Sequence, residues 1–181
     1  MKSPQIDKMI PAHDSHDWND QVEELLVDWR QRVYAAQSAH YAATDHYRRL
    51  NYLIGVPAII FSSVVGTAIF ASLNEHAADQ NKIIVAIISI AAAVLSALQT
   101  FLRFSERATQ HATAADWYSA IRRDIEQTLH LAVGSRGSPK DCLDRIRKEI
   151  NRVGQNAPEL KVSLWQREAK RFGVKEVLNG P

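Results

Sequence analysis

The chain has 181 residues, a formal net charge of +2 and a mean hydropathy of −0.25. This length suits one domain or one membrane module. The near balance of charge excludes a strongly basic polyanion-binding protein and gives no indication of sequence-specific nucleic-acid binding. Cys142 is the single cysteine, which excludes an intrachain disulfide framework and a paired-cysteine metal site. The average hydropathy hides two long uncharged stretches set between charged flanks.

The segment before the first uncharged stretch is polar at its start and periodic afterwards. Residues 1–17 are predicted to be a flexible N-terminus, and the first 49 residues contain no apolar core of a signal peptide. Residues 18–49 have no internal Gly or Pro. Their apolar side chains recur at three- and four-residue steps, which predicts a cytoplasmic helix with one apolar stripe.

Two uncharged stretches follow, at residues 50–73 and 83–102. A helix needs about 20 mainly apolar residues to cross the hydrocarbon core of a bilayer. Neither stretch has the 3.6-residue alternation of a half-exposed soluble helix. They predict two antiparallel transmembrane helices joined by an external loop at residues 74–82.

The basic residues around the two spans predict their orientation. Arg48 and Arg49 precede the first span, and Arg103 and Arg107 follow the second. The loop between the spans carries Lys82 together with two acids. Because Lys and Arg collect on the cytoplasmic side, both chain termini are predicted to be cytoplasmic.

Small residues recur at four-residue spacing in both spans. They are Ala58, Ser62 and Gly66 in the first span, and Ser89, Ala93 and Ala97 in the second. Helices in lipid associate through close approach at such residues. Two alternatives stay open, namely that the ladders face each other within one hairpin or that a ladder packs against a second copy.

The spans carry little other polarity. Neither contains an ionisable side chain, and proton pumps and coupled transporters usually place one at depth. This argues against active transport and leaves a passive pore with an apolar constriction open. Pro57, inside the first span, is predicted to kink that helix or to loosen a hydrogen bond.

Residues 103–132 again lack helix breakers and predict a second cytoplasmic helix that continues straight out of the membrane. The hairpin would then extend into an antiparallel stalk. Matching depths along the two helices brings His40 level with His111 and Asp45 level with Arg107, so we predict stalk contacts at these pairs. The two histidines are interpreted as structural, because a metal site needs more ligands than two.

The remainder, residues 138–181, is predicted to be a C-terminal helical segment after the break at Gly134–Pro139. Ser138 can cap a helix with Pro139 at its first position. The amphipathic end of the segment would lie against the stalk or on the membrane surface with Trp165 as an anchor, and both alternatives stay open.

The sequence contains no nucleotide-binding loop, hydrolase or metalloprotease motif. No catalytic, cofactor-binding or metal-binding residues are therefore predicted, and an enzyme is not expected. The predicted fold is an all-α membrane protein, in which an antiparallel transmembrane hairpin extends into a cytoplasmic helical stalk with a short C-terminal helix.

Several runs resemble a known family: LNYLIGVPAII, SSVVGTAIFASL, AAVLSALQTFLRFSERATQH and WYSAIRRDIE. Over about residues 18–160 the chain resembles the SLATT domain, the SMODS- and SLOG-associating two-transmembrane effector. The resemblance implies a pore-forming, homo-oligomeric effector in the bacterial inner membrane that acts in antiviral defense. It implies partners among nucleotide second-messenger synthetases, SLOG sensors or reverse transcriptases, and it carries no catalytic residues over.

Two other functions stay open beside the gated pore. One is a non-conducting membrane anchor or signalling scaffold whose stalk recruits a soluble partner. The other is a nucleotide second-messenger receptor, with a stalk pocket near Arg122 and Arg123. The activating signal, the number of copies and the ion selectivity have no signature in the residues.

Overall fold

The computed structural model describes residues 18–72 and 79–174. The predicted flexible N-terminus 1–17, most of the predicted loop and the last residues 175–181 lie outside the described residues. The described chain consists of five α-helices and one short 3-10 helix, and it contains no strand. This confirms the predicted all-α class.

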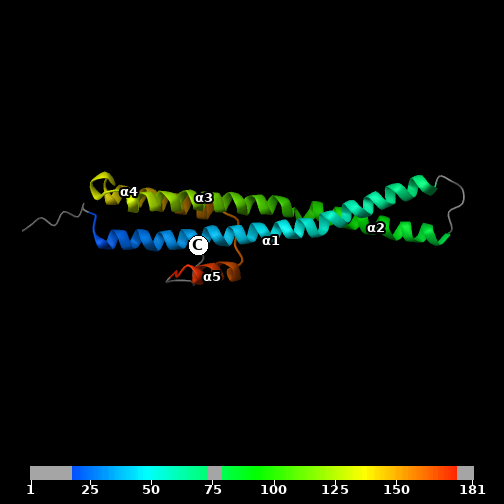
Figure 1. The fold of residues 1–181 in the computed structure, drawn as a ribbon, viewed down its shortest axis with the longest axis horizontal. Helices are drawn as coiled ribbons and strands as arrows, with labels where there is room; N and C mark the ends of the chain where they lie inside the picture. Colours follow the sequence, from blue (N-terminus) through cyan, green and yellow to red (C-terminus); the bar gives the residue numbers. More distant parts are fainter. Residues whose placement is uncertain (1–17, 73–78, 175–181) are drawn as a thin grey trace, which may run out of the picture.

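The helix α1 spans Asp20–Ser72, 53 residues, and at 1.5 Å per residue it is about 80 Å long. The Asn19 side chain accepts a hydrogen bond from the backbone N–H of Val22 at 3.0 Å, which satisfies a donor that the first turn leaves free. The helix continues through Pro57. It thus contains both the predicted cytoplasmic helix and the predicted first span in a single element (Figure 1).

Two helices share the length of α1 as packing partners. α2, Asp79–Leu102, packs against the C-terminal half of α1, and α3, Phe104–His130, packs against its N-terminal half. Residues 79–82, predicted to belong to the loop, are the first turn of α2. Figure 1 shows α1 and α2 crossing each other at a shallow angle as they run toward the loop.

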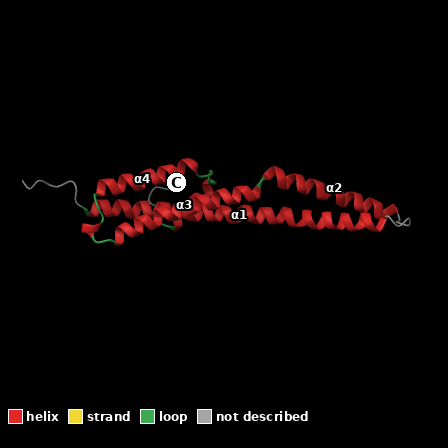
Figure 2. Cartoon of the chain, turned by 90° about the horizontal axis from the view of Figure 1, so that it is seen from above, coloured by secondary structure: helices red, strands yellow, loops and turns green. Residues whose placement is uncertain are grey.

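The second span and the second cytoplasmic helix are not one straight helix, which corrects the prediction. Arg103 separates α2 from α3 and adopts the left-handed conformation, with φ 48° and ψ 39°; Figure 2 shows the interruption as a short loop segment. For a non-glycine residue this conformation costs about 1–2 kcal/mol relative to the right-handed helical conformation. After the break, Phe104 packs its ring near that of Tyr47 with centroids 6.2 Å apart, so the change of direction lays α3 along α1.

The predicted break at Gly134–Pro139 is confirmed. A 3-10 helix, Val133–Ser135, precedes a turn in which Gly137 has a φ of +72°. α4, Pro139–Asn156, then begins after Ser138 with proline in its first turn, and it packs mainly on α3.

The last helix, α5, spans Val162–Arg171 and packs on α1; in Figure 1 it lies on the side of α1 away from α3. Trp165 is only 3% exposed and belongs to the apolar core. Of the two alternatives for this segment, the described part therefore lies against the stalk. Ser38 and Phe172 complete the contact, with a hydrogen bond from Ser38 to Glu168 and stacking of Phe172 on Tyr34.

Burial is divided sharply along the molecule. The stalk half has a contiguous core built from α1, α3, α4 and α5, around Leu26, Ile125 and Ile146. In the hairpin half, the most apolar 18-residue windows of the two long helices have only 11% and 6% of their residues buried. A core helix of a soluble protein would be mostly buried, so the apolar surface of this half is left for lipid or for other chains to cover.

The left-handed conformation of Arg103 predicts which of two substitutions at this position gives the more stable protein. In a continuous helix, Ala would be more stable than Gly by about 1 kcal/mol. At φ 48° the order should reverse, so Arg103→Gly should be more stable than Arg103→Ala by about 1 kcal/mol. Both variants lose the ion pair of Arg103 with Glu106, which makes each the control for the other. Unfolding of the purified protein in detergent measures the difference, and a more stable Ala variant would show that the helix is continuous.

Candidate functional site

The outward faces of the hairpin carry large aliphatic and aromatic side chains. Leu53, Ile59 and Ile90 are 70%, 68% and 66% exposed, and Phe101 is 82% exposed. Soluble proteins rarely expose a contiguous surface of such side chains to water. The faces suit the hydrocarbon core of a bilayer.

Several hydroxyl groups on these helices are satisfied within their own helix. Ser63 donates to the carbonyl oxygen of Ile59 at 2.9 Å, Ser89 to that of Val85 at 2.7 Å, and Thr100 to that of Ser96 at 3.1 Å. Bonds to the carbonyl four residues back satisfy these three hydroxyl donors without water. These residues therefore fit a lipid-exposed helix in spite of their polarity.

The two small-residue ladders do not face each other inside one hairpin. Ala58 is buried, and Gly66 and Ser89 are half-buried. Ser62, Ala93 and Ala97 are exposed, and a side chain added at Gly66 would meet no atom within 4 Å. The structure thus brings the six residues together only in part, and packing of a ladder against a second copy stays a prediction.

The buried small residues of the hairpin coincide with the ladders only at Ala58. Ala58 of α1 and Ala92 of α2 are 4% and 7% exposed. A Cβ at Gly55 would lie 3.1 Å from the Nε2 atom of Gln99. Four-residue spacing indicates that a helix has a face of small residues, but it does not indicate which helix packs against that face. The sequence therefore did not identify Gly55, Ala92 or Gln99 as contact residues.

In the stalk, His40 of α1 and His111 of α3 meet as predicted from their depth. Their Nδ1 atoms are 3.0 Å apart, and both rings are buried. The Nε2 atom of His40 is buried without a partner. An unpaired lone pair is tolerated better than an unpaired N–H, so we assign the proton of His40 to Nδ1, from which it donates to Nδ1 of His111.

The environment of the pair favours neutral imidazoles. Burial, and then the charge of His111, lower the pKa of His40 to about 4, and burial lowers the pKa of His111. Tyr118 stacks on His40 and Tyr47 stacks on His111. The described residues contain no group of three or more His, Cys, Asp or Glu side chains that could hold a metal ion.

The other predicted stalk contact is absent. Asp45 and Arg107 are both exposed and form no ion pair with each other in the described part of the chain. The guanidinium carbon of Arg107 instead lies 6.0 Å from the centre of the Tyr47 ring, within reach of a cation–π contact.

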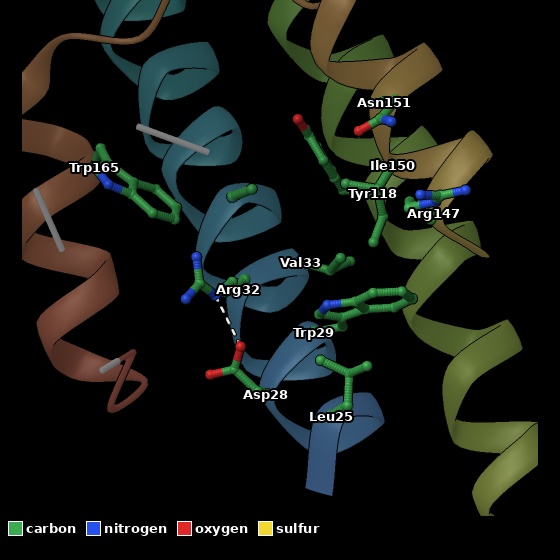
Figure 3. Close-up of a pocket in the computed structure, with 11 residues that line it drawn as sticks. Leu25, Asp28, Trp29, Arg32, Val33, Tyr118, Arg147, Ile150, Asn151 and Trp165 are labelled. Atoms are coloured by element: carbon green, nitrogen blue, oxygen red, sulfur yellow. Dashed lines mark hydrogen bonds and ion pairs between the residues drawn. The ribbon is translucent and has the colours of Figure 1, made fainter. Parts of the chain in front are cut away.

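A cavity of about 420 Å³ lies in the stalk, where four helices meet (Figure 3). Its walls are mainly apolar and aromatic, and a few polar groups converge on it. The lining residues are Leu25, Asp28, Trp29, Arg32, Val33 and Ala36 of α1, Tyr118 of α3, Arg147, Ile150 and Asn151 of α4, and Trp165 of α5. An apolar cavity with a few convergent polar groups is the usual form of a small-molecule site.

The two cations at this cavity are oriented by neighbouring acids. The Nε atom of Arg32 lies 2.9 Å from Asp28, and Arg147 lies 2.8 Å from Asp144. Neither Arg122 nor Arg123, where the sequence suggested a nucleotide pocket, lines the cavity. The Arg122 guanidinium lies over the Tyr34 ring at 4.7 Å, and Arg123 donates to the hydroxyl of Ser119 at 2.9 Å.

Comparison with known proteins now gives the family. Residues 22–169 match the model of the SMODS and SLOG-associating 2TM effector domain family 4, SLATT_4. The chain belongs to the SLATT family. The match includes both apolar helices, the His40–His111 pair and every residue that lines the cavity of Figure 3.

The SLATT match confirms the predicted resemblance. No curated protein and no solved structure matches the chain. The exposed apolar helices and the two-transmembrane family together indicate a membrane protein. SLATT domains are two-transmembrane effector domains and not known catalytic folds.

The buried imidazoles predict that acid weakens the stalk. The pKa of His40 is lower in the folded chain than in the unfolded chain. The contribution of the neutral His40 ring to the free energy of unfolding is therefore complete above about pH 6.5 and is lost as the pH falls toward 4. Between pH 7.5 and 4.5 the loss is on the order of 2 kcal/mol. Among the described residues no carboxylate packs on the rings to offset this loss, since the groups that face the pair are Tyr47, Tyr118 and, through Tyr47, Arg107.

Thermal unfolding in detergent across this pH range measures the effect. His40→Gln should flatten the pH dependence, whereas His46→Gln, which changes an exposed histidine of the same helix, should leave it unchanged. Equal pH dependence in the wild-type protein and in His40→Gln would show that the buried pair does not set it.

Proposed function

We propose that this chain is a gated effector of a bacterial conflict system, which oligomerises in the inner membrane with both termini cytoplasmic and permeabilises the membrane on a cytoplasmic signal. One antiparallel pair of helices encloses no lumen, so a pore requires several copies. The signal comes from a separate partner, such as a nucleotide second-messenger synthetase, a SLOG sensor or a reverse transcriptase.

One observation supports this proposal above the others. The small residues Ser62, Ala93 and Ala97 are exposed, although the hairpin already has a contact of its own at Ala58 and Ala92. Small residues let helix backbones approach closely in lipid. A helix face that consists of small residues and is exposed in the single chain is suited to packing against a neighbouring copy. Membership of a two-transmembrane effector family agrees with an oligomeric effector.

Leucine substitutions test the proposal in cells. Ser62→Leu and Ala93→Leu should abolish depolarisation, read with a voltage-sensitive dye during induction, because the added side chain holds neighbouring copies apart. The matched controls are Ser63→Leu and Ala91→Leu, whose side chains point about 100° and 200° round the helix from those faces. They should depolarise like the wild type at equal abundance in the membrane.

The two remaining outcomes separate the alternatives. Full depolarisation by Ser62→Leu and Ala93→Leu would show that the small-residue ladders are not needed for the activity. For a scaffold, replacing both spans by an unrelated hairpin should preserve function in the conflict system, whereas a pore should lose it.

The cavity of Figure 3 favours a second function, that of a nucleotide receptor. Trp29 and Trp165 supply aromatic surface, and Arg32 and Arg147 supply positive charge. A planar base with an anionic group matches this pairing of stacking and charge. In the proposed effector, such a ligand would act as the cytoplasmic signal.

Calorimetry of the detergent-solubilised protein with ATP and with cyclic dinucleotides tests this second function. Arg147→Gln should weaken binding about tenfold, as expected for loss of one charge-assisted hydrogen bond. Arg152→Gln is the matched control, because both arginines lie on α4, pair with an acid three residues earlier and are similarly exposed. Equal weakening in both variants, or no heat with any of these ligands, would exclude a nucleotide site here.

A further inference from the structure

A second hollow, of about 480 Å³, lies between α1 and the beginning of α5. Its polar lining consists mainly of Asp45, His46 and Arg49 from α1, Lys161, which directly precedes α5, and Arg167 in the middle of α5. Arg49 directly precedes Leu50, where the predicted first span begins. The groove is therefore at the level of the cytoplasmic membrane surface in the proposed orientation.

The described residues that line the groove carry more positive than negative charge. Three cations, Arg49, Lys161 and Arg167, share it with one carboxylate, Asp45. Arg49 and Lys161 are exposed and have no ion pair within the described ranges. Arg145, Arg147 and Arg152 of α4, in contrast, are each paired with an acid.

A buried acid fixes Arg167 beside the groove. Glu168 is 3% exposed and accepts hydrogen bonds from Nε of Arg167 at 2.8 Å and from the hydroxyl of Ser38 at 2.9 Å. Burial raises the pKa of Glu168, but the hydrogen bonds from Arg167 and Ser38 outweigh it, so that the pKa is lowered overall. The bond uses Nε of Arg167, which leaves the two terminal nitrogens outside it.

The groove continues into an apolar face of the same helix. Counted at 100° per residue, Arg49, Leu53, Val56 and Ile60 lie on one face of α1. Leu53, Val56 and Ile60 are 70%, 47% and 53% exposed. A cationic groove directly followed by an exposed aliphatic face has the polarity of a phospholipid, with the phosphate at the groove and an acyl chain along the helix.

We propose that this groove binds the phosphate of an anionic phospholipid headgroup. Basic pockets on the cytoplasmic side of a membrane protein are suited to such headgroups. The bound lipid would bridge α1 and α5, because the groove takes its cations from both helices. This inference rests on the membrane placement in the proposed function, but not on conduction.

Lipid binding to the purified full chain tests the proposal directly. Native mass spectrometry in detergent would follow binding of phosphatidylglycerol and phosphatidylcholine to the wild type and to the double variant Arg49→Gln, Lys161→Gln. Neither residue makes an ion pair with another described residue, so the variant should fold. It should bind phosphatidylglycerol at least about tenfold more weakly, since each basic residue near an anionic headgroup contributes measurably.

The control variant Lys140→Gln, Lys148→Gln removes two exposed cations from α4 and changes the net charge equally. It should bind phosphatidylglycerol like the wild type. Equal weakening in both variants, or no preference for phosphatidylglycerol over phosphatidylcholine, would overturn the proposal. Binding of glycerol 3-phosphate, a soluble phosphate ester, is measured in the same way. If it binds as tightly as phosphatidylglycerol, and if the double variant Arg49→Gln, Lys161→Gln weakens its binding equally, the groove is a site for a free phosphate instead. Because binding is read without conduction, a failed pore and a failed lipid site remain distinguishable.

Discussion

The continuity of α1 is the constraint on which the rest of the structure depends. A single helix from Asp20 to Ser72 provides one wall of the stalk and one wall of the hairpin. α2, α3 and α5 all pack on it, and α4 reaches it through α3 with few direct contacts. The continuous backbone of α1 therefore connects the stalk half and the apolar half directly on this side.

The opposite wall is divided, and the division is strained. α2 and α3 meet at Arg103, whose left-handed conformation costs energy for a residue with a side chain. Strain of this kind persists only where the surrounding packing holds it. Here the stacking of Phe104 and His111 on Tyr47 and the buried His40–His111 contact hold α3 against α1 just beyond the break. The angle between the two halves is therefore set by packing in the stalk.

The sequence predicted those features that depend on one helix at a time. Uncharged length identified the spans, and breaker residues located the start of α4. Depth matching predicted the contact of His40 with His111, because both lie on the faces that α1 and α3 turn to each other. The same argument was wrong for Asp45 and Arg107, because it used height without rotation. Asp45 lies five residues after His40 and so about 140° round the helix, away from α3.

Features that depend on several helices had no local signal. Arginine is not a helix breaker, so nothing in the residues around Arg103 predicts its conformation. Trp29, Arg147 and Trp165 are far apart in the sequence and meet only because α4 and α5 fold back along α1. The small-residue ladders show the same limit, since a spacing specifies a face and leaves open what covers it.

The shortest α-helix connects the two candidate ligand sites. α5 contributes Trp165 to the cavity of Figure 3 and Lys161 and Arg167 to the basic groove. Its ten residues are too few to be stable alone, and its main contact is with α1. A ligand in the cavity and a headgroup in the groove would each stabilise the same docked position of α5. Because stabilisation of one conformation by two ligands makes their binding mutually favourable, the two proposed sites are coupled by geometry. A cytoplasmic signal and the lipid surface would then act on one element, held against the helix that continues into the membrane.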